Sequence, residues 1–186
     1  DIKRMLSYGA MAHSGFILPL CLFVETYDVF KFYVVFYAII NILAFLFVQL
    51  HENEGENLSL SKLSGLGMKF PYLGGISVVW TISLVGLPPT WGFMAKLFLF
   101  STAWNYYESV NSLYWLTFIG LGILSSAASL YFYLRVPYFY FFKQDQGRKL
   151  DISRIHFAIL ALLAFTLIFL FIQPNILDRF APMINP

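Results

Sequence analysis

The chain has 186 residues, of which 59% are hydrophobic and 12% are charged, and its mean hydropathy is +0.71. Average globular domains carry about 25% charged residues, so this composition excludes an ordinary water-soluble domain and predicts an integral membrane protein. The formal net charge of +2 gives no indication of nucleic-acid binding, and a single cysteine excludes an internal disulfide or a cysteine-bound metal cluster.

Four apolar segments account for most of the chain. A helix needs roughly 20 apolar residues to cross the hydrocarbon core of a bilayer. The segments are residues 5–24, 32–50, 113–142 and 156–173. The acidic run at 51–59, which follows the second segment, is expected to be solvated surface.

A further segment, residues 70–107, is too long for one straight crossing, about 55 Å at 1.5 Å per residue. It contains the stretch GLPPTWGFMAKLFLF at 86–100. Pro88 and Pro89 lack amide donors and disfavour helix before them, and Gly86 and Gly92 add flexibility on both sides. The residues alone allow two short spans joined by an exposed turn, or one crossing with an unwound centre.

Lys96 is the only charged residue between Lys69 and Glu108. A charge at membrane depth costs at least ~2.5–3.5 kcal/mol, so its presence suggests a function. The break leaves carbonyls near residues 84–86 without helical partners, and lipid tolerates such groups only inside protein or beside a wet cavity. A buried lysine beside them is a candidate proton or cation site, because burial disfavours its charged form. The alternative is a lysine that snorkels to the membrane surface.

His13 is the second candidate, because histidine titrates near physiological pH. It follows Ser7 and Tyr8 in the first segment, and their hydroxyls could form a hydrogen-bonded relay with the imidazole. The alternative is a histidine that holds two helices together by hydrogen bonding. Asn41, in the middle of the second segment, has the same two interpretations, and hydrogen bonding between helices is the more common one.

Other classes of site lack their motifs. The remaining histidines, His51 and His156, lie at segment ends and are expected at the membrane surface. Three scattered histidines without clustered carboxylates predict no metal site, and no glycine-rich nucleotide motif is present. We expect no cofactor or redox centre in this chain.

Three stretches resemble signatures of the antiporter-like membrane subunits of respiratory complex I. DIKRMLSYGAMAHSGF resembles [D/N]xKR-x-x-AYSSIxHxG, GLPPTWGFMAKLFLF resembles G[I/L]PPxxGFxxKxx[L/F], and LYFYLRV resembles YYYLR. They occur in the family's order. Because Leu97 rather than an acidic residue follows Lys96, the chain is most similar to the NADH dehydrogenase subunit 2 branch. Gly9 and Met11 depart from the first signature.

The resemblance implies an all-α integral membrane fold with five transmembrane helices. They are 5–24, 32–50, 71–107 (interrupted at 87–91, near Pro88 and Pro89), 113–142 and 156–173. Together they would form most of the second inverted repeat of the family. The whole chain, 1–186, would then be a single transmembrane helical domain and half of a larger bundle.

The resemblance also implies a function, as a membrane subunit of proton-translocating NADH:ubiquinone oxidoreductase. Lys96 would carry protons at the broken helix, with His13 on the polar axis that leads to it. Ser7, Tyr8 and Asn41 would extend that axis. Flavin, iron–sulfur clusters and quinone would be bound by other subunits of this enzyme.

Expected partners are other membrane subunits of the complex, phospholipids, and a separate chain that supplies the N-terminal half of the subunit. A split mitochondrial gene would explain that second chain and would place the protein in the mitochondrial inner membrane. The high content of Phe and Tyr fits an AT-rich organellar genome. Removal of the N-terminal half is the other explanation. The functional alternatives are a subunit of a cation/proton antiporter and a structural scaffold that pumps nothing.

Overall fold

The computed structural model describes residues 1–21, 26–52, 58–145, 147, 150 and 152–173, and this part of the chain contains helices and loops but no strand. The all-α fold expected from the sequence is therefore confirmed. The α-helices are α1 (Ile2–Cys21), α2 (Tyr27–His51), α3 (Leu66–Lys69), α4 (Pro71–Val85), α5 (Trp91–Val110), α6 (Leu113–Phe142) and α7 (Arg154–Ile172), with a 3-10 turn, η2, at Leu60–Leu63.

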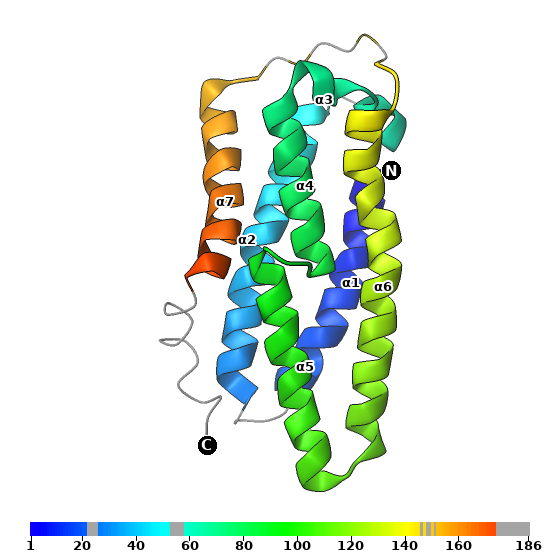
Figure 1. Cartoon of the computed structure of the whole chain (residues 1–186), viewed down its shortest axis with the longest axis vertical. Helices are drawn as coiled ribbons and strands as arrows, with labels where there is room; N and C mark the ends of the chain where they lie inside the picture. Colours follow the sequence, from blue (N-terminus) through cyan, green and yellow to red (C-terminus); the bar gives the residue numbers. More distant parts are fainter. Residues whose placement is uncertain (22–25, 53–57, 146, 148–149, 151, 174–186) are drawn as a thin grey trace.

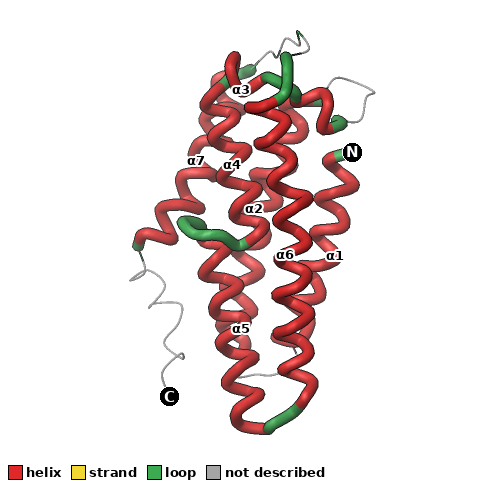
Figure 2. The backbone as a smooth tube through the Cα atoms, turned by 45° about the vertical axis from the view of Figure 1, so that its right-hand side comes forward, coloured by secondary structure: helices red, strands yellow, loops and turns green. Residues whose placement is uncertain are grey.

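The long helices lie side by side along one axis of the molecule (Figure 1). Helices α4 and α5 follow one another along this axis, so that together they form one interrupted rod beside α1, α2, α6 and α7. Figure 2 shows the same arrangement from another side, with a short loop joining the lower end of α5 to α6. We call the end of the bundle where α2 ends and α4 begins the upper end.

The arrangement of α4 and α5 favours one interrupted crossing over two short spans. In the described part of the chain, three helices, within Val29–His51, Leu113–Phe142 and Arg154–Ile172, are each long and apolar enough to cross a membrane. Helix α4 has only 15 residues, about 22 Å, which is shorter than the hydrocarbon core of roughly 30 Å. Since α5 continues along the same axis, the pair can complete one crossing, and the break lies at 86–90 rather than 87–91.

The residues at the break explain why α4 ends and α5 begins there. Gly86 adopts a left-handed conformation with φ of 86°, and its amide donates to the carbonyl of Ile82 at 2.9 Å, which closes α4 as a glycine C-cap does. Two prolines follow, which cannot donate to a continuing helix. The side chain of Thr90 donates to the carbonyl of Leu87 at 2.7 Å, and α5 begins at the next residue.

Large side chains fill the space between the helices. Several are almost inaccessible to solvent: Trp80, Tyr33, Tyr140, Phe36 and Phe47. Close packing of this kind holds membrane helices together, because apolar side chains gain no hydrophobic free energy by moving from lipid into the protein interior. Helix α1 turns one face to this core, through Ile2, Leu6, His13, Phe16 and Leu20.

Two ion pairs join segments at the upper end. Lys3 Nζ lies 2.6 Å from a carboxylate oxygen of Glu52, and Lys69 pairs with Asp145. All four side chains are at least partly accessible to solvent, so each pair contributes little to stability. Both lysines have a carboxylate partner, and this distinguishes them from the lysine of the site described below.

Candidate functional site

The side chain of Lys96 lies at the break between α4 and α5. It is 6% exposed, and its ammonium donates to the carbonyl oxygen of Val85 at 2.6 Å and to the hydroxyl of Ser126 at 3.0 Å. The ring of Phe16 lies 5.6 Å from Nζ, within the range of a cation–π contact. The ammonium thus joins the last turn of α4, the middle of α6 and the inner face of α1.

Two glycines make room for this arrangement. A Cβ at Gly86 would lie 2.6 Å from Cδ of Lys96, inside the space that the lysine stem occupies. A Cβ at Gly92 would overlap the carbonyl oxygen of Ser83, so only glycine lets the first turn of α5 approach the last turn of α4. Both glycines were expected to loosen the helix, and the structure shows that they also permit close contact.

The partners of Lys96 are all uncharged. None of the ion pairs among the described residues includes it, whereas Lys3 and Lys69 each face a carboxylate. The predicted free carbonyl near residues 84–86 is present as that of Val85. The burial of Lys96 and the position of its ammonium at the break favour the site interpretation over a lysine that snorkels to the membrane surface.

His13 lies close to this break, on the buried face of α1. Its Nδ1 is 2.8 Å from the hydroxyl of Tyr33, and its ring stacks on Tyr37 with the centroids 4.7 Å apart. The imidazole also lies near the main chain of Leu84 and near Lys96. The ring of Phe16 contacts both, edge-on to His13 at 6.0 Å and below the ammonium of Lys96. The two predicted site residues are therefore brought together.

The expected relay of Ser7 and Tyr8 with His13 is wrong. Both residues lie on the exposed side of α1, and the hydroxyl of Ser7 donates to the carbonyl of Lys3 on its own helix. At about 100° per residue, positions five and six before His13 point to another face of the helix. Asn41 likewise bonds to its own helix, at the carbonyl of Tyr37.

Sequence reasoning missed three members of the site: Tyr33, Ser126 and Phe16. Each of these residues lies on a different helix from a polar group that it contacts: Tyr33 from His13, and Ser126 and Phe16 from Lys96. Residue spacing along a single helix could therefore not identify them. For Tyr33 and Ser126 the available signal was a hydroxyl inside an apolar segment, and the chain has many of these; Phe16 is one of 21 phenylalanines and carries no such signal.

A groove reaches the site from the outer surface between α5 and α6. Its volume is about 330 Å³, and Val85, Gly86, Lys96 and Ser126 contribute to its wall. Two buried polar atoms near the break, Oγ of Ser83 and Nε1 of Trp91, have no hydrogen-bond partner in the described part of the chain. Buried polar atoms of this kind are usually satisfied by ordered water.

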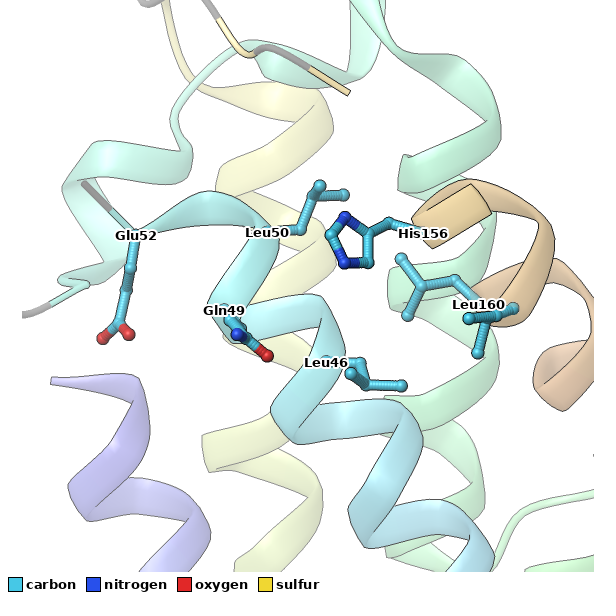
Figure 3. A pocket seen from close by; sticks show the side chains of 7 residues that line it. Leu46, Gln49, Leu50, Glu52, His156 and Leu160 are labelled. Atoms are coloured by element: carbon cyan, nitrogen blue, oxygen red, sulfur yellow. The ribbon is translucent and has the colours of Figure 1, made fainter. Parts of the chain in front are cut away.

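A second cavity, of about 280 Å³, lies at the upper end between α2 and α7. Figure 3 shows Glu52 and His156 on opposite sides of the end of α2, so the two titratable groups do not converge. His51, which was expected at the membrane surface, is the last residue of α2 and is buried among other side chains, with Nδ1 2.7 Å from the carbonyl of Phe47 and Nε2 3.1 Å from the hydroxyl of Tyr140. No group of three metal-ligating residues occurs among the described residues.

Comparison with known protein families identifies the family of this chain. The family described as "NADH:quinone oxidoreductase/Mrp antiporter, TM" matches residues 1–126. The chain belongs to this family. Both the histidine on α1 and the interrupted rod with its lysine lie within the matched residues.

Similar proteins within the NADH:quinone oxidoreductase/Mrp antiporter family come from bacteria. NADH-quinone oxidoreductase subunit N 2 of Chloroherpeton thalassium is 32% identical over 90% of this chain and 32% of its own length. Subunit N of Trichlorobacter lovleyi is 40% identical over 78% of this chain and 29% of its own length. The chain thus spans about a third of the length of these relatives.

A solved structure shares the fold. A chain of respiratory complex I from Thermus thermophilus with bound aureothin aligns with a TM-score of 0.79 and 27% identity. The alignment covers 94% of this chain and 39% of the other. The resemblance to antiporter-like membrane subunits that the motifs indicated is confirmed at the level of the family.

Proposed function

We propose that the chain is part of a proton-translocating membrane subunit of NADH:quinone oxidoreductase, of the kind called subunit 2, and that Lys96 carries protons at the interrupted helix. The observation that carries this proposal is the ammonium of Lys96, buried at the break with only neutral partners. A buried lysine without a counter-ion can release its proton and take it up again, because no carboxylate holds it in the charged form.

The break supplies the polar surroundings that proton exchange needs. The carbonyl of Val85 stabilises the ammonium, and a groove between α5 and α6, lined mostly by apolar side chains, opens beside it. The unpaired atoms of Ser83 and Trp91 are further places where water can bind at this depth. These features support a hydrated segment of a proton path.

His13 is the next member of the proposed path. Its imidazole bonds to the hydroxyl of Tyr33, and the ring of Phe16 lies close both to it and to the ammonium of Lys96. Tyr37 stacks on the imidazole, and Asn41 lies one turn further along α2. Protons would pass between His13 and Lys96 through water at the break, while Asn41 would contribute only at the edge of the path.

Electron transfer would take place in other subunits, which would hold the flavin, the iron–sulfur clusters and the quinone. Coupling would reach Lys96 as a change of charge in neighbouring helices, which alters its affinity for a proton. Residues 1–186 would act as a single helical domain within a larger bundle. A separate partner chain would supply the N-terminal half of the subunit.

That partner would be a separate chain encoded by the other part of a split mitochondrial gene, and the assembly would lie in the inner membrane with bound phospholipids. The richness in Phe and Tyr supports an organellar origin. Sequencing the source genome would test this: a second open reading frame for the N-terminal half on the organellar DNA is expected, and one continuous gene would contradict it.

Purification in mild detergent tests the main proposal. We expect the chain to copurify with flavin and iron–sulfur subunits, identified by mass spectrometry and by their absorbance. The family also includes Mrp antiporters, so recovery with small antiporter subunits alone would favour cation/proton exchange instead. A scaffold that pumps nothing would copurify with the same redox subunits, and substitution of Lys96 is needed to separate that case.

A further inference from the structure

Three serines of α6, in the stretch SSAAS, have different surroundings. Ser125 lines a cavity between α1 and α6, and the hydroxyl of Ser129 donates to the carbonyl of Ser126 on its own helix at 2.7 Å. Only Ser126 reaches across to α5, where its hydroxyl oxygen accepts a hydrogen bond from Nζ of Lys96 at 3.0 Å. The position of Ser126 therefore links α6 to the proposed proton carrier.

The two hydrogen-bond partners of Lys96 differ in what they can offer. A carbonyl oxygen can only accept, whereas a serine hydroxyl has one proton to donate and lone pairs to accept with. A charged ammonium has three N–H donors and no acceptor, and both Val85 and Ser126 suit it. A neutral amine keeps two N–H groups and gains one lone pair, which needs a donor.

Among the hydrogen-bond partners that the described residues provide for Lys96, Ser126 alone has a proton to donate. An unsatisfied lone pair in a buried site is costly, because no bulk water replaces the missing bond. Rotation of the hydroxyl about its Cβ–Oγ bond changes it from acceptor to donor without moving the oxygen. The same atom can then hold the lysine nitrogen in place in both protonation states.

We propose that Ser126 is a positioning residue that serves both protonation states of Lys96, accepting from the ammonium and donating to the neutral amine. The inference rests on the proposed function of Lys96 as a proton carrier. Ser126 itself gains and loses no proton, since its O–H only turns. The proton that leaves Nζ passes to the water or side chain that follows in the path. Val85 remains bonded to an N–H of the lysine throughout.

The test uses a pair of variants of nearly the same shape in the assembled complex. Ser126→Thr keeps the hydroxyl, and Ser126→Val replaces it with a methyl group. Each complex is reconstituted in liposomes, and proton uptake driven by NADH oxidation is measured per assembled complex. The amount of assembled complex is measured by native gel. We expect Ser126→Val to slow coupled proton uptake roughly tenfold and Ser126→Thr to restore most of it.

Ser126→Ala provides a second test that adds no volume, and Ser125→Ala and Ser129→Ala are matched controls on the same helix. We expect Ser126→Ala to behave as Ser126→Val does and both controls to pump normally. Normal coupled uptake in Ser126→Ala would overturn the proposal. Loss of assembled complex with normal uptake in the complexes that remain would overturn it as well, since it would indicate a purely structural role.

Lys96→Met, measured in parallel, separates this inference from the function on which it rests. If Lys96→Met pumps normally, the proposed function fails and the role of Ser126 fails with it. If Lys96→Met stops pumping while Ser126→Ala pumps normally, only the inference about Ser126 fails.

Discussion

The break between α4 and α5 and the upper end of the bundle contain the same kinds of polar side chain in different surroundings. A lysine, a histidine bonded to a tyrosine hydroxyl, and that tyrosine occur in both: Lys96, His13 and Tyr33 at the break, and Lys69, His51 and Tyr140 at the upper end. The upper lysine faces a carboxylate and water, whereas the lysine at the break faces a carbonyl, a hydroxyl and a ring.

The two histidines differ in the same way. His51 bonds through Nδ1 to a carbonyl of its own helix and through Nε2 to Tyr140, so both ring nitrogens join structural elements. His13 bonds to Tyr33 and also lies within electrostatic reach of Lys96. Residue type alone therefore does not mark a proton path. The candidate site is distinguished by a nearby helix break and by the lack of a counter-ion among the residues that the structure describes.

The largest effect is expected from closing the space at the break. Gly92→Val would push a side chain into the carbonyl of Ser83, so α5 could not approach α4. We expect destabilisation of more than about 3 kcal/mol and loss of assembled complex, measured by native gel and by thermal unfolding in detergent. Gly75→Ala in α4 is the control, since no atom lies within 4 Å of its added Cβ. Equal stability of the two variants would show that the approach of α4 to α5 is not tight.

Substituting the two histidines should separate function from structure. His13→Gln keeps a hydrogen-bonding group but cannot carry a proton, and we expect coupled proton uptake to fall roughly tenfold or more with little change in thermal stability. His51→Gln should leave uptake per assembled complex unchanged and lower stability by about 1–3 kcal/mol, because Tyr140 or Phe47 loses a partner. The reverse pattern would contradict the comparison.

Removal of the tyrosine hydroxyls should have a smaller effect. Tyr33→Phe and Tyr140→Phe each delete one hydrogen bond to a histidine, at a cost of about 1 kcal/mol. Only Tyr33→Phe should also slow proton uptake, because only Tyr33 bonds to a member of the proposed path. Thermal unfolding and proton uptake on the same preparations check both statements, and equal uptake in the two variants would remove Tyr33 from the path.

The smallest effect is expected at the exposed ion pair. The hydrogen bond from Lys69, followed by that from the amide of Gly147, lowers the pKa of Asp145. A lowered carboxyl pKa stabilises the fold above the ordinary pKa of aspartate, and this contribution is lost as the pH falls through the folded-state value. Asp145→Asn should therefore be indistinguishable from wild type in pumping, with at most a slight loss of stability at neutral pH that vanishes in acid.

The sequence allowed the interrupted helix to be predicted because its signals are local. Two prolines, two glycines and a lone lysine occur within eleven residues, and the structure places the break one residue earlier than expected. The limits of the helix expected at 113–142 agree with those of α6. The free carbonyl expected near residues 84–86 and the buried lysine also follow from the residues of this one stretch.

Contacts between helices could not be predicted in the same way. Tyr33 is 20 residues from His13, and Ser126 is 30 residues from Lys96, so their meeting depends on how the helices are rotated against one another. The expected relay of Ser7 and Tyr8 was wrong because nearness in sequence does not place residues on one face of a helix. The short helices η2 and α3 could not be predicted in this way, because an apolar segment long enough to cross a membrane indicates only the long helices.

The most direct test of the central claim compares Lys96→Met with Lys69→Met in the assembled complex. Both variants remove one ammonium group, the first at the break and the second at the upper end. Proton uptake into liposomes, driven by NADH oxidation and measured per assembled complex, is predicted to be lost in Lys96→Met and unchanged in Lys69→Met. Normal uptake in Lys96→Met would contradict the account and would leave the chain a structural role.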